Sequence, residues 1–521
     1  MTTETSIYEY GKQGLRFGAE RTALWFYGCS ISYGELFEKI DNVADHLYAL
    51  GVREGTVVTI HLPNCPQAVM AIYAVGKLGG ICNMVHALMP AKGVQESMRS
   101  TESSFLITYA PFQTEGRITV LLVDPTDYMD RSSNPESGSH QREGVSFLQF
   151  EKPAVKSAVS RPELFYRKCC FLMSSTGTTG KPKIVMLTHL AVNAWLENAK
   201  TCFPAGDKLE KQRCLSVAPF THSMGLTADL LRAISCGGTL YMMMRWNVEE
   251  AVSIIKQKHI TFMTGVPSMY QSLLQREDFS GDDISYLQYC VVGGDNVSEE
   301  LKQRLDERVG KGRVCYPEYG LTEAASAVCQ LTPDHDKRHA SGYPIKGTKI
   351  AVLSAEGEIK ASGEGELIVS SGSLMLGYFK DAEATAQALF CHDGEKWLHT
   401  GDYGSVDRDG YVFFKDRIKN IIIHNGYNII PNEIESCIKT VDGVIEACVL
   451  EIKDNNSERT LLAAIVELAA NMDPQRVSGT IETACKSSLP AYAVPRRLVF
   501  VDQLPRNALG KIERSALREL I

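Results

Sequence analysis

The chain has 521 residues, a net charge of -8 at pH 7, and 44% hydrophobic and 22% charged residues. This length exceeds what one hydrophobic core usually supports, so a large domain and at least one smaller domain are expected. The acidic balance argues against binding of nucleic acid or an anionic membrane surface, both of which require positive charge. No segment approaches the length of a membrane span and no apolar leader follows the N-terminus, so we expect a cytoplasmic protein.

Helical and strand patterns alternate from the N-terminus onward. An amphipathic pattern over Tyr33–Leu50 predicts a helix, the apolar run Val57–Leu62 predicts a strand, and Gln67–Leu78 predicts a second helix. This alternation is typical of α/β proteins with largely parallel sheets. The Ser-, Pro- and Gly-rich segment Asp124–Gly144 predicts a surface connection. The 15 cysteines show no Cys-x-x-Cys spacing, which favours reduced, buried thiols.

A predicted strand at Cys169–Met173 leads into the sequence SSTGTTGKPK. Glycines let successive backbone N–H groups face one concavity, while hydroxyls and lysines add donors and positive charge, which suits a triphosphate. The same composition also fits a solvated turn between two strands. The loop is not a Walker A motif, because its glycines are too close together and Lys181 is followed by Pro182. The candidate phosphate-binding residues are Ser174, Ser175, Thr176, Gly177, Thr178, Thr179, Gly180 and Lys183.

This loop resembles the phosphate-binding signature of the adenylate-forming superfamily, which includes acyl- and aryl-CoA synthetases, adenylation domains of peptide synthetases and beetle luciferases. Thr176 stands at the usual Ser, and Ile184 at the usual Gly. The resemblance implies a large N-terminal domain of packed α/β sheets and a small mobile α+β C-terminal domain. It also implies ATP, Mg²⁺ and CoA as the molecules that the protein binds.

Further sequences resemble the signatures of this family in the family's order. APFTHSMGL, residues 218–226, is similar to the motif before the acyl pocket. His222 stands where amino-acid-activating members carry Asp, which argues against an α-amino acid substrate because neutral imidazole cannot replace that anion. A histidine at a strand end can equally be a structural hydrogen-bonding group. VVGGDNV, residues 291–297, resembles the turn that approaches adenine with Gly294 and Asp295.

YPEYGLTEA, residues 316–324, resembles the next signature. The resemblance implies that Tyr319 stacks on adenine beside Gly320 and that Thr322 hydrogen-bonds the α-phosphate. It implies that Glu323 holds Mg²⁺, a cation that prefers carboxylate and phosphate oxygens.

The C-terminal signatures imply the ribose site, the hinge and the adenylation lysine. WLHTGDYG and DGYVFFKDRIKN resemble the ribose site and hinge, with Asp402 accepting from the ribose hydroxyls and Arg417 supporting it. Lys419 falls at the hinge, so we predict domains at residues 1–418 and 419–521. Gly426 in HNGYN would border the pantetheine channel of CoA. LPRNALGKIER resembles the closing motif, in which Lys511 reaches the active site.

We therefore expect an AMP-forming acid–thiol ligase in which Lys511, Thr322, Glu323 and His222 serve the reaction. Two alternatives stay open: an enzyme that loads the phosphopantetheine thiol of a carrier protein, and a non-catalytic relative with a binding or regulatory role. The expected partners are a small carboxylic acid, ATP and CoA, in a monomer or homodimer. The sequence does not identify the acid, whose pocket we expect to include His222, Met224 and the turn Val291–Gly294.

Overall fold

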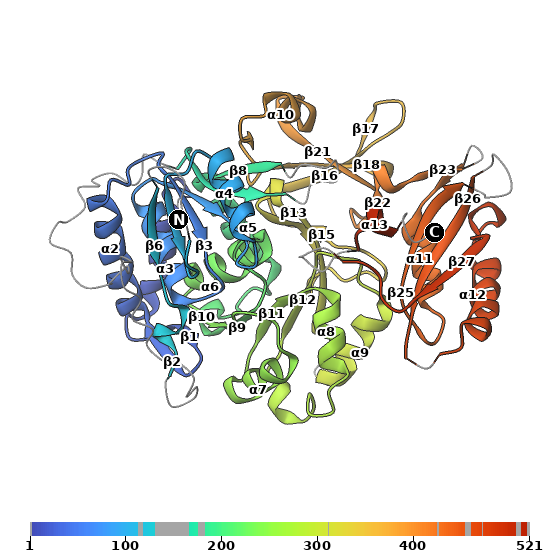
Figure 1. Cartoon of the computed structure of the whole chain (residues 1–521), viewed down its shortest axis with the longest axis horizontal. Coiled ribbons are helices and arrows are strands. Elements are labelled where there is room, and N and C mark those ends of the chain that lie inside the picture. Colours follow the sequence, from blue (N-terminus) through green and yellow to red (C-terminus); the bar gives the residue numbers. More distant parts are fainter. Residues whose placement is uncertain are drawn as a thin grey trace. The chain divides into compact units, whose positions relative to one another are not determined.

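The computed structural model describes residues 3–112, 118–130, 166–175, 183–310, 312–424, 427–453, 460–470, 472–506 and 512–517. The chain forms two compact units. The larger contains residues 1–350, 369–399 and 409–412, and the smaller contains residues 351–368, 400–408 and 413–521. Sheets and helices alternate through the larger unit, in agreement with the expected α/β class (Figure 1).

A seven-stranded sheet carries the expected phosphate loop between two of its strands. Its order is β19-β8-β7-β4-β3-β5-β6, and the pairs from β7 to β6 are parallel, whereas β8 and β19 are antiparallel to their neighbours. The strands are β3 (Val57–His61), β4 (Ile81–Met84), β5 (Phe105–Thr108), β6 (Thr119–Leu122), β7 (Cys169–Ser174), β8 (Ile184–Thr188) and β19 (Gly377–Tyr378). The predicted strands at Val57–Leu62 and Cys169–Met173 are confirmed as β3 and β7.

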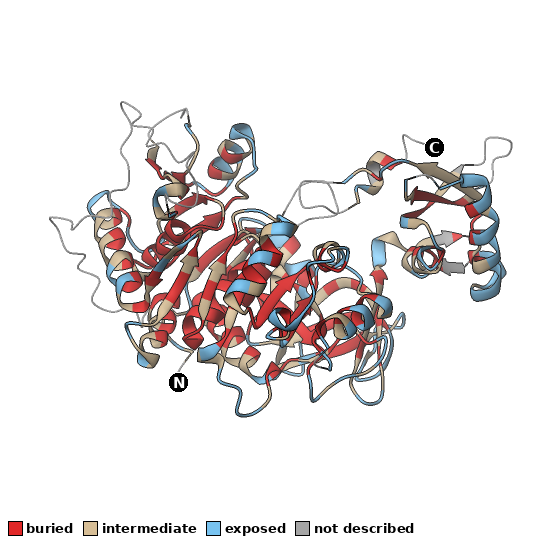
Figure 2. Cartoon of the chain, turned by 90° about the horizontal axis from the view of Figure 1, so that it is seen from below, coloured by how far each residue is buried: buried red, intermediate tan, exposed pale blue. Residues whose placement is uncertain are grey.

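A nine-stranded sheet forms the other major layer of the larger unit. Its order is β15-β14-β13-β12-β11-β9-β10-β1-β2, with a parallel centre from β13 to β1. The strands are β1 (Thr22–Phe26), β2 (Cys29–Ser32), β9 (Arg213–Ser216), β10 (Thr239–Met242), β11 (Phe262–Gly265), β12 (Tyr289–Val292), β13 (Cys315–Leu321), β14 (Ser326–Gln330) and β15 (Tyr343–Pro344). In Figure 2 the strands of the larger unit are mostly buried.

Most helices of the larger unit begin where the sequence supplies a cap or a proline. Ser32 and Glu35 form a reciprocal capping box at the start of α2, and Pro66 occupies the first turn of α3. Both predicted helices are thereby confirmed. The helices are α1 (Ile7–Lys12), α2 (Tyr33–Ala49), α3 (Pro66–Lys77), α4 (Ala91–Ser100), α5 (His189–Ala199), α6 (Arg232–Cys236), α7 (Val248–Lys258), α8 (Pro267–Leu274), α9 (Glu299–Val309) and α10 (Ala382–Ala388).

A π-helix over Met224–Leu231 runs directly into α6 and is buried along its whole length. Its i→i+5 hydrogen bonding is rare in proteins and occurs frequently at functional sites. It follows β9 by a short connection that contains the APFTHS sequence. Gly225 is required here, because a Cβ atom at this position would lie 2.2 Å from the backbone oxygen of Ala218.

A six-stranded sheet follows, and the division of the chain into units falls within four of its strands, β16, β18, β21 and β22. Its order is β17-β16-β18-β21-β20, and β22 also pairs with β21. The strands are β16 (Thr348–Leu353), β17 (Ile359–Lys360), β18 (Gly363–Ser371), β20 (Leu389–His392), β21 (Glu395–Val406) and β22 (Val412–Arg417).

The smaller unit has a core of its own. Its three-stranded sheet, in the order β25-β26-β27, packs Val449 and Val466 against Ile434 and Ile481 of two helices. Its remaining elements include a short hairpin and a C-terminal helix. The elements are β23 (Ile422–His424), β24 (Tyr427–Ile429), α11 (Pro431–Lys439), β25 (Val444–Lys453), β26 (Thr460–Leu468), α12 (Pro474–Ser488), β27 (Arg497–Val501) and α13 (Arg514–Leu517).

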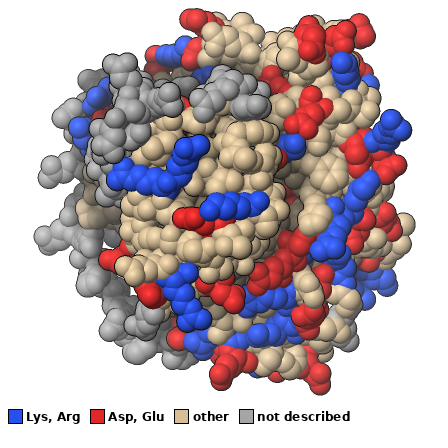
Figure 3. All heavy atoms as spheres, turned by 90° about the vertical axis from the view of Figure 1, so that its right-hand side faces the viewer, with Lys and Arg blue, Asp and Glu red and all other residues tan. Residues whose placement is uncertain are grey.

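The thiols agree with the expectation drawn from the cysteine spacing. Acidic and basic side chains are interspersed on the face that Figure 3 shows. All 15 cysteines are free thiols and most are buried, with Cys391 exposed. Throughout the described ranges, every helix is too short or too polar to traverse a lipid bilayer.

Candidate active site

The two ends of the expected phosphate loop are joined by hydrogen bonds. Ser174 is the last residue of β7 and pairs with Ile184 of β8. The backbone N–H of Ser175 donates to the Lys183 carbonyl at 2.8 Å, and its hydroxyl donates to the same oxygen at 3.3 Å. Residues between these ends lie outside the described part of the chain, among them Thr176, Gly177, Thr178, Thr179 and Gly180.

Tyr378 links the end of this loop to Glu323. The Lys183 ammonium lies 4.8 Å from the centre of the Tyr378 ring, within the range of a cation–π interaction. The Tyr378 hydroxyl donates to Glu323 Oε1 at 3.0 Å. The backbone N–H of Met375 also donates to the Glu323 carbonyl at 2.7 Å. Two residues that are predicted to bind phosphate and Mg²⁺ are thus brought together by a third that the sequence motifs do not single out.

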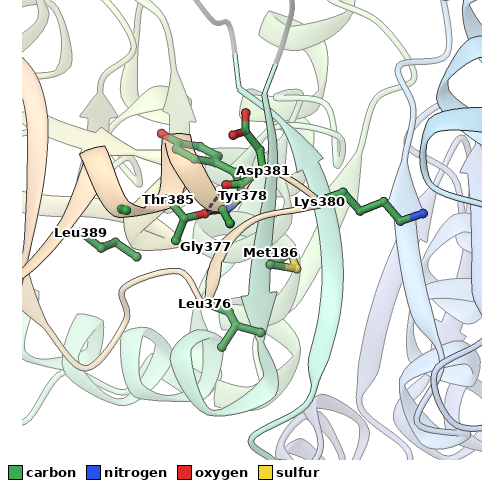
Figure 4. A pocket seen from close by; sticks show the side chains of 10 residues that line it. Met186, Leu376, Gly377, Tyr378, Lys380, Asp381, Thr385 and Leu389 are labelled. Carbon is green, nitrogen blue, oxygen red and sulfur yellow. Dashed lines mark hydrogen bonds between the residues drawn. The ribbon is translucent and has the colours of Figure 1, made fainter.

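Tyr378 borders a cavity of about 570 Å³ between β8, β19 and α10 (Figure 4). Its backbone N–H donates to the Thr385 hydroxyl at 2.9 Å, which fixes β19 against α10. Within the described ranges, none of the residues predicted from the motifs lines this cavity. The cavity therefore lies beside the predicted site and is not that site.

The YGLTE residues lie at the end of β13 and in the turn that follows. Tyr319 and Gly320 belong to β13, and Thr322 and Glu323 form a short 3-10 helix with Ala324. A Cβ atom at Gly320 would lie 2.6 Å from Ala327 Cα, so glycine is required here by the close approach of β14. This structural requirement is independent of any contact between Gly320 and a nucleotide.

The glycine turn follows β12 and the histidine follows β9, and β11 lies between these two strands in the sheet. Gly294 follows β12 with a φ of +80°, which favours glycine, and the Asp295 carboxylate accepts from the Asn296 N–H at 2.8 Å. His222 is half-buried, and its Nδ1 accepts from the Met224 N–H at 3.3 Å, at the start of the π-helix. His222 thus has a structural hydrogen bond, and its predicted role in the reaction stays open.

In the smaller unit, the predicted ribose-binding residues form an ion pair. Arg417 Nε lies 2.8 Å from Asp402 Oδ1, and the Asp402 carboxylate is fully buried. Arg417 also donates to the Thr400 carbonyl at 3.2 Å, which holds the end of β22 against β21. A rigid guanidinium in this position orients the carboxylate for further hydrogen bonds.

Asp416, which the motifs do not single out, organises the segment around the predicted hinge. Its Oδ1 accepts from the Arg417 N–H at 2.7 Å and from the Asn420 side chain at 2.8 Å, and its Oδ2 accepts from the Asn432 N–H at 3.1 Å. Lys419 lies within this segment, in the 3-10 helix Ile418–Asn420. Burial, together with the nearby charges of Arg417 and Arg514, lowers the pKa of Lys419.

The closing motif is anchored by Arg514, which pairs with the buried Glu435 at 2.7 Å and donates to the Val449 carbonyl at 2.9 Å. Gly426 and Lys511 lie outside the described residues.

The residues around Glu323 fit the expected Mg²⁺. This ion is commonly held by one or two carboxylates together with phosphate oxygens and water, and does not need a cage of protein ligands. The described residues contain no cluster of three or more His, Cys, Asp or Glu side chains arranged as metal ligands. Glu323 accepts a hydrogen bond at Oε1 from Tyr378, which orients the carboxylate, and among the described residues Oε2 accepts none, so a cation could bind there.

Comparison with known proteins shows the family. A model of the AMP-binding enzymes matches residues 12–379, and a model of the C-terminal domain of the AMP-binding enzymes matches residues 433–511. The chain belongs to the AMP-binding enzymes.

Among sequence relatives, this AMP-binding enzyme is 30% identical to a long-chain-fatty-acid–CoA ligase of Bacillus subtilis (strain 168), over 96% of this chain and 92% of that protein. It is 29% identical to a feruloyl-CoA synthase of Amycolatopsis sp, over 96% of both chains.

Solved structures show the same fold. The o-succinylbenzoate CoA synthetase from Bacillus subtilis, in complex with its acyl-adenylate intermediate, matches with a TM-score of 0.81 at 25% identity, over 98% of this chain and 97% of that chain. An anthranilate CoA ligase in complex with anthranoyl-AMP matches with a TM-score of 0.84 at 22% identity, over 100% and 98%. At 22% identity, the match to the anthranilate CoA ligase shows only that the two proteins share a fold.

The expected superfamily and fold of this AMP-binding enzyme are confirmed. The roles assigned to single residues, the domain boundary at residues 418 and 419, and the hinge at Lys419 stay predictions. Tyr378 and Asp416 were missed because their importance depends on contacts that strand pairing creates. A tyrosine directly after a glycine at the start of a strand is the one local signal for Tyr378.

Proposed function

We propose that this protein joins a carboxylic acid to the α-phosphate of ATP, releases pyrophosphate, and then transfers the acyl group to the thiol of CoA. It is an AMP-forming acid–thiol ligase. The relatives named above, a fatty-acid–CoA ligase and a feruloyl-CoA synthase, support this reaction class. The observation that supports the proposal most directly is the link from Lys183 through Tyr378 to Glu323, since we assign Lys183 to the phosphates and Glu323 to Mg²⁺.

The first half-reaction brings two anions together, so the site must offset negative charge and align the attacking carboxylate with the α-phosphate. We assign Thr322 and Lys511 to the α-phosphate and Ser174–Lys183 to the phosphates that leave. Mg²⁺, held by Glu323, would supply further positive charge to the phosphates. No side-chain nucleophile is required, because the substrate carboxylate itself attacks.

The nucleoside would be held by residues from several motifs. We assign Tyr319, Gly294 and Asp295 to the adenine and Asp402 with Arg417 to the ribose hydroxyls. Asp402 suits this role because its partner Arg417 already offsets its charge, which lets the buried carboxylate remain an acceptor.

In the second half-reaction the CoA thiol attacks the acyl-adenylate and AMP leaves. We propose that a hinge motion at Lys419 exchanges the surface of the smaller domain that faces the acyl-adenylate, and that Gly426 borders the pantetheine arm. Such a motion would separate the two half-reactions in time.

Measurement of pyrophosphate release with ATP, Mg²⁺ and a panel of aliphatic and aromatic acids tests the proposal. We expect release with at least one acid class and, after addition of CoA, the corresponding acyl-CoA by mass spectrometry. If a thioester formed only with a phosphopantetheinylated carrier protein, that carrier protein and not CoA would be the acceptor. No pyrophosphate with any acid would favour the non-catalytic alternative. Gel filtration with light scattering would distinguish monomer from homodimer.

A further inference from the structure

Glu318 is a carboxyl group that the reaction described above does not use. It lies on β13, directly before Tyr319, and the residue is half-buried. Acidic side chains are costly to place in a protein interior unless they are paired or hydrogen-bonded. A function for this carboxyl must therefore be sought in the space that it faces.

The Glu318 side chain lies against the glycine turn. A Cβ atom at Gly293 would lie 2.7 Å from Glu318 Cγ, 2.9 Å from Glu318 Oε1 and 3.1 Å from Met224 Cε. The carboxyl group therefore occupies the space that any side chain at position 293 would need. Met224 and Gly293 are residues that we expect to form the wall of the acyl pocket, so Glu318 belongs to the same wall.

Strand register places Glu318 where ligands commonly bind in α/β sheets. Val292 of β12 pairs with Pro317 of β13 in the parallel centre of the sheet, which brings Gly293 and Glu318 to the same level, just beyond the carboxyl end of β12. Thr264 of β11 pairs with Val291, two residues before Gly293. Because side chains alternate along a strand, Thr264 and Glu318 face the same side of the sheet. Ligands of such sheets bind at these carboxyl ends.

A second carboxyl group lies on this side of the sheet. Asp229 of the π-helix is fully buried and accepts from the Thr264 hydroxyl at 2.7 Å and from the Ser216 hydroxyl at 3.0 Å. Burial, followed by the charge of Asp229, raises the pKa of Glu318 to about 8.

The nearby cation does not pair with Glu318. The Arg232 guanidinium donates to the Ala228 carbonyl at 2.7 Å and to Gln212 Oε1 at 2.6 Å, and it lies 3.9 Å from the centre of the Phe262 ring. Throughout the described ranges, no residue hydrogen-bonds the Glu318 carboxyl group. The charge of Arg232 therefore acts on two carboxyl groups, Asp229 and Glu318. Among the described residues, none uses the hydrogen-bonding capacity of the Glu318 carboxyl group.

We propose that Glu318 selects the substrate by binding a hydrogen-bond donor, an amino or hydroxyl group, on the acyl part of the acid, away from the reacting carboxylate. This inference rests on the proposed function, because it assigns the substrate class of the same site. It excludes a plain alkyl chain as the preferred substrate, since such a chain would leave the carboxyl group desolvated and without a partner.

Matched acids that differ in one group test the inference. Hexanoate is compared with its ω-hydroxy and ω-amino derivatives, and benzoate with its para-hydroxy and para-amino derivatives, by kcat/KM for pyrophosphate release. We expect the wild-type protein to prefer a donor-bearing acid over its unsubstituted counterpart by about 100-fold. Equal kcat/KM within both series would overturn the inference.

Two variants separate the chemistry of Glu318 from its volume. Glu318→Leu should abolish the preference and raise kcat/KM for the unsubstituted acid. Glu318→Gln keeps a hydrogen-bond acceptor but cannot ionise to pair with an ammonium group, so it should keep a preference for the hydroxy acid and lose one for a charged amine. Glu300→Gln, on the exposed face of α9, is the matched control. A preference that persists in Glu318→Leu would overturn the assignment to this residue.

Binding without turnover distinguishes failure of this inference from failure of the proposed function. Acyl-sulfamoyl adenosines made from each acid pair mimic the adenylate and cannot react, so calorimetric affinities are independent of catalysis. A preference for the donor-bearing analogue that is lost in Glu318→Leu supports the inference even without pyrophosphate release. Equal binding of the two analogues, or binding of neither, overturns it.

Discussion

Tyr378 connects two charged side chains in different ways. Its ring face lies over the Lys183 ammonium, and its hydroxyl donates to the Glu323 carboxylate. A hydrogen bond to a charged group contributes about 1.5–3 kcal/mol, roughly twice the contribution of a neutral one. The hydroxyl therefore fixes the orientation of Glu323, the predicted Mg²⁺ ligand. The cation–π contact with Lys183 requires only the ring.

Tyr378→Phe should lower kcat/KM for adenylate formation by about 10-fold or more and raise the Mg²⁺ concentration needed for half-maximal activity. The physical reason is loss of the hydrogen bond to Glu323 with the ring retained. Pyrophosphate release over a Mg²⁺ titration measures both effects. Tyr286→Phe, at an exposed tyrosine of the larger unit, is the control. An unaltered Mg²⁺ dependence would show that Tyr378 does not position Glu323.

Lys511→Ala should abolish formation of the acyl-adenylate and leave thioester formation from supplied acyl-adenylate largely intact. The reason is that the predicted contact of Lys511 with the α-phosphate is needed only while two anions are brought together. Pyrophosphate release and acyl-CoA formation are measured separately. Lys486→Ala, at an exposed lysine of α12, is the matched control. Equal loss of both half-reactions would contradict this division of roles.

At the scale of elements, the π-helix and the ends of β9 and β11 form one unit held together by Asp229. The Ser216 and Thr264 hydroxyls come from neighbouring strands and both donate to this carboxyl group. Burial raises the pKa of Asp229 to about 7. The folded protein therefore keeps a proton on Asp229 that the unfolded chain releases above about pH 4.

This raised pKa predicts how stability depends on pH. The contribution of Asp229 to the free energy of unfolding is fully present below its unfolded pKa and is lost as the pH rises through about 7, by about 1.4 kcal/mol per pH unit. In the Asp229→Asn variant, which has no carboxyl group at this position, this pH-dependent fall in the free energy of unfolding should be absent. Denaturant titrations between about pH 5 and pH 8 measure this. The free energy of unfolding of the wild-type protein should fall relative to that of the variant up to about pH 7, and above that pH the two should change in parallel. Asp283→Asn, at an exposed aspartate, is the control; parallel profiles throughout would contradict the prediction.

At the scale of the whole molecule, local sequence patterns predicted the helices and strands well. Residues whose role depends on long-range contacts could not be predicted from these patterns. The amphipathic pattern of α2 and the apolar runs of β3 and β7 predicted these elements because burial there follows a local period. The π-helix was not predicted, since its apolar residues also fit an α-helix. The resemblance placed Thr322, Glu323, Asp402 and Arg417 by motif, and the last two indeed form an ion pair.

Other residues of the site could not be predicted, because their partners come from distant strands. Tyr378 reaches Glu323 only because β19 pairs with β8, and Glu318 contacts Gly293 only because β12 and β13 are neighbours. Glu318 stands inside a motif, but its neighbours in the sequence give no sign that it faces Gly293 and Met224.

Restricting the proposed hinge should separate the two half-reactions. Lys419→Pro should leave adenylate formation near the wild-type rate and slow acyl transfer to CoA by about 10-fold or more, because proline fixes φ. Single-turnover measurements of each half-reaction check this. Lys419→Ala removes the charge but keeps the backbone rotation, so it should transfer the acyl group faster than Lys419→Pro. Equal slowing of both half-reactions by Lys419→Pro would contradict a hinge at this position.

The anchoring of the closing motif has a practical consequence for how Lys511 is studied. The Glu435 carboxylate is almost fully buried, and Arg514, near the end of the chain, is its ion-pair partner. Removal of one partner of a buried ion pair costs about 3–5 kcal/mol, because the other charge is left without compensation. A truncation that deletes Lys511 would also delete Arg514 and destabilise the core formed by α11 and β25. Loss of activity in a shortened chain would therefore report a damaged domain as much as a missing lysine, whereas a point substitution at Lys511 leaves that anchor in place.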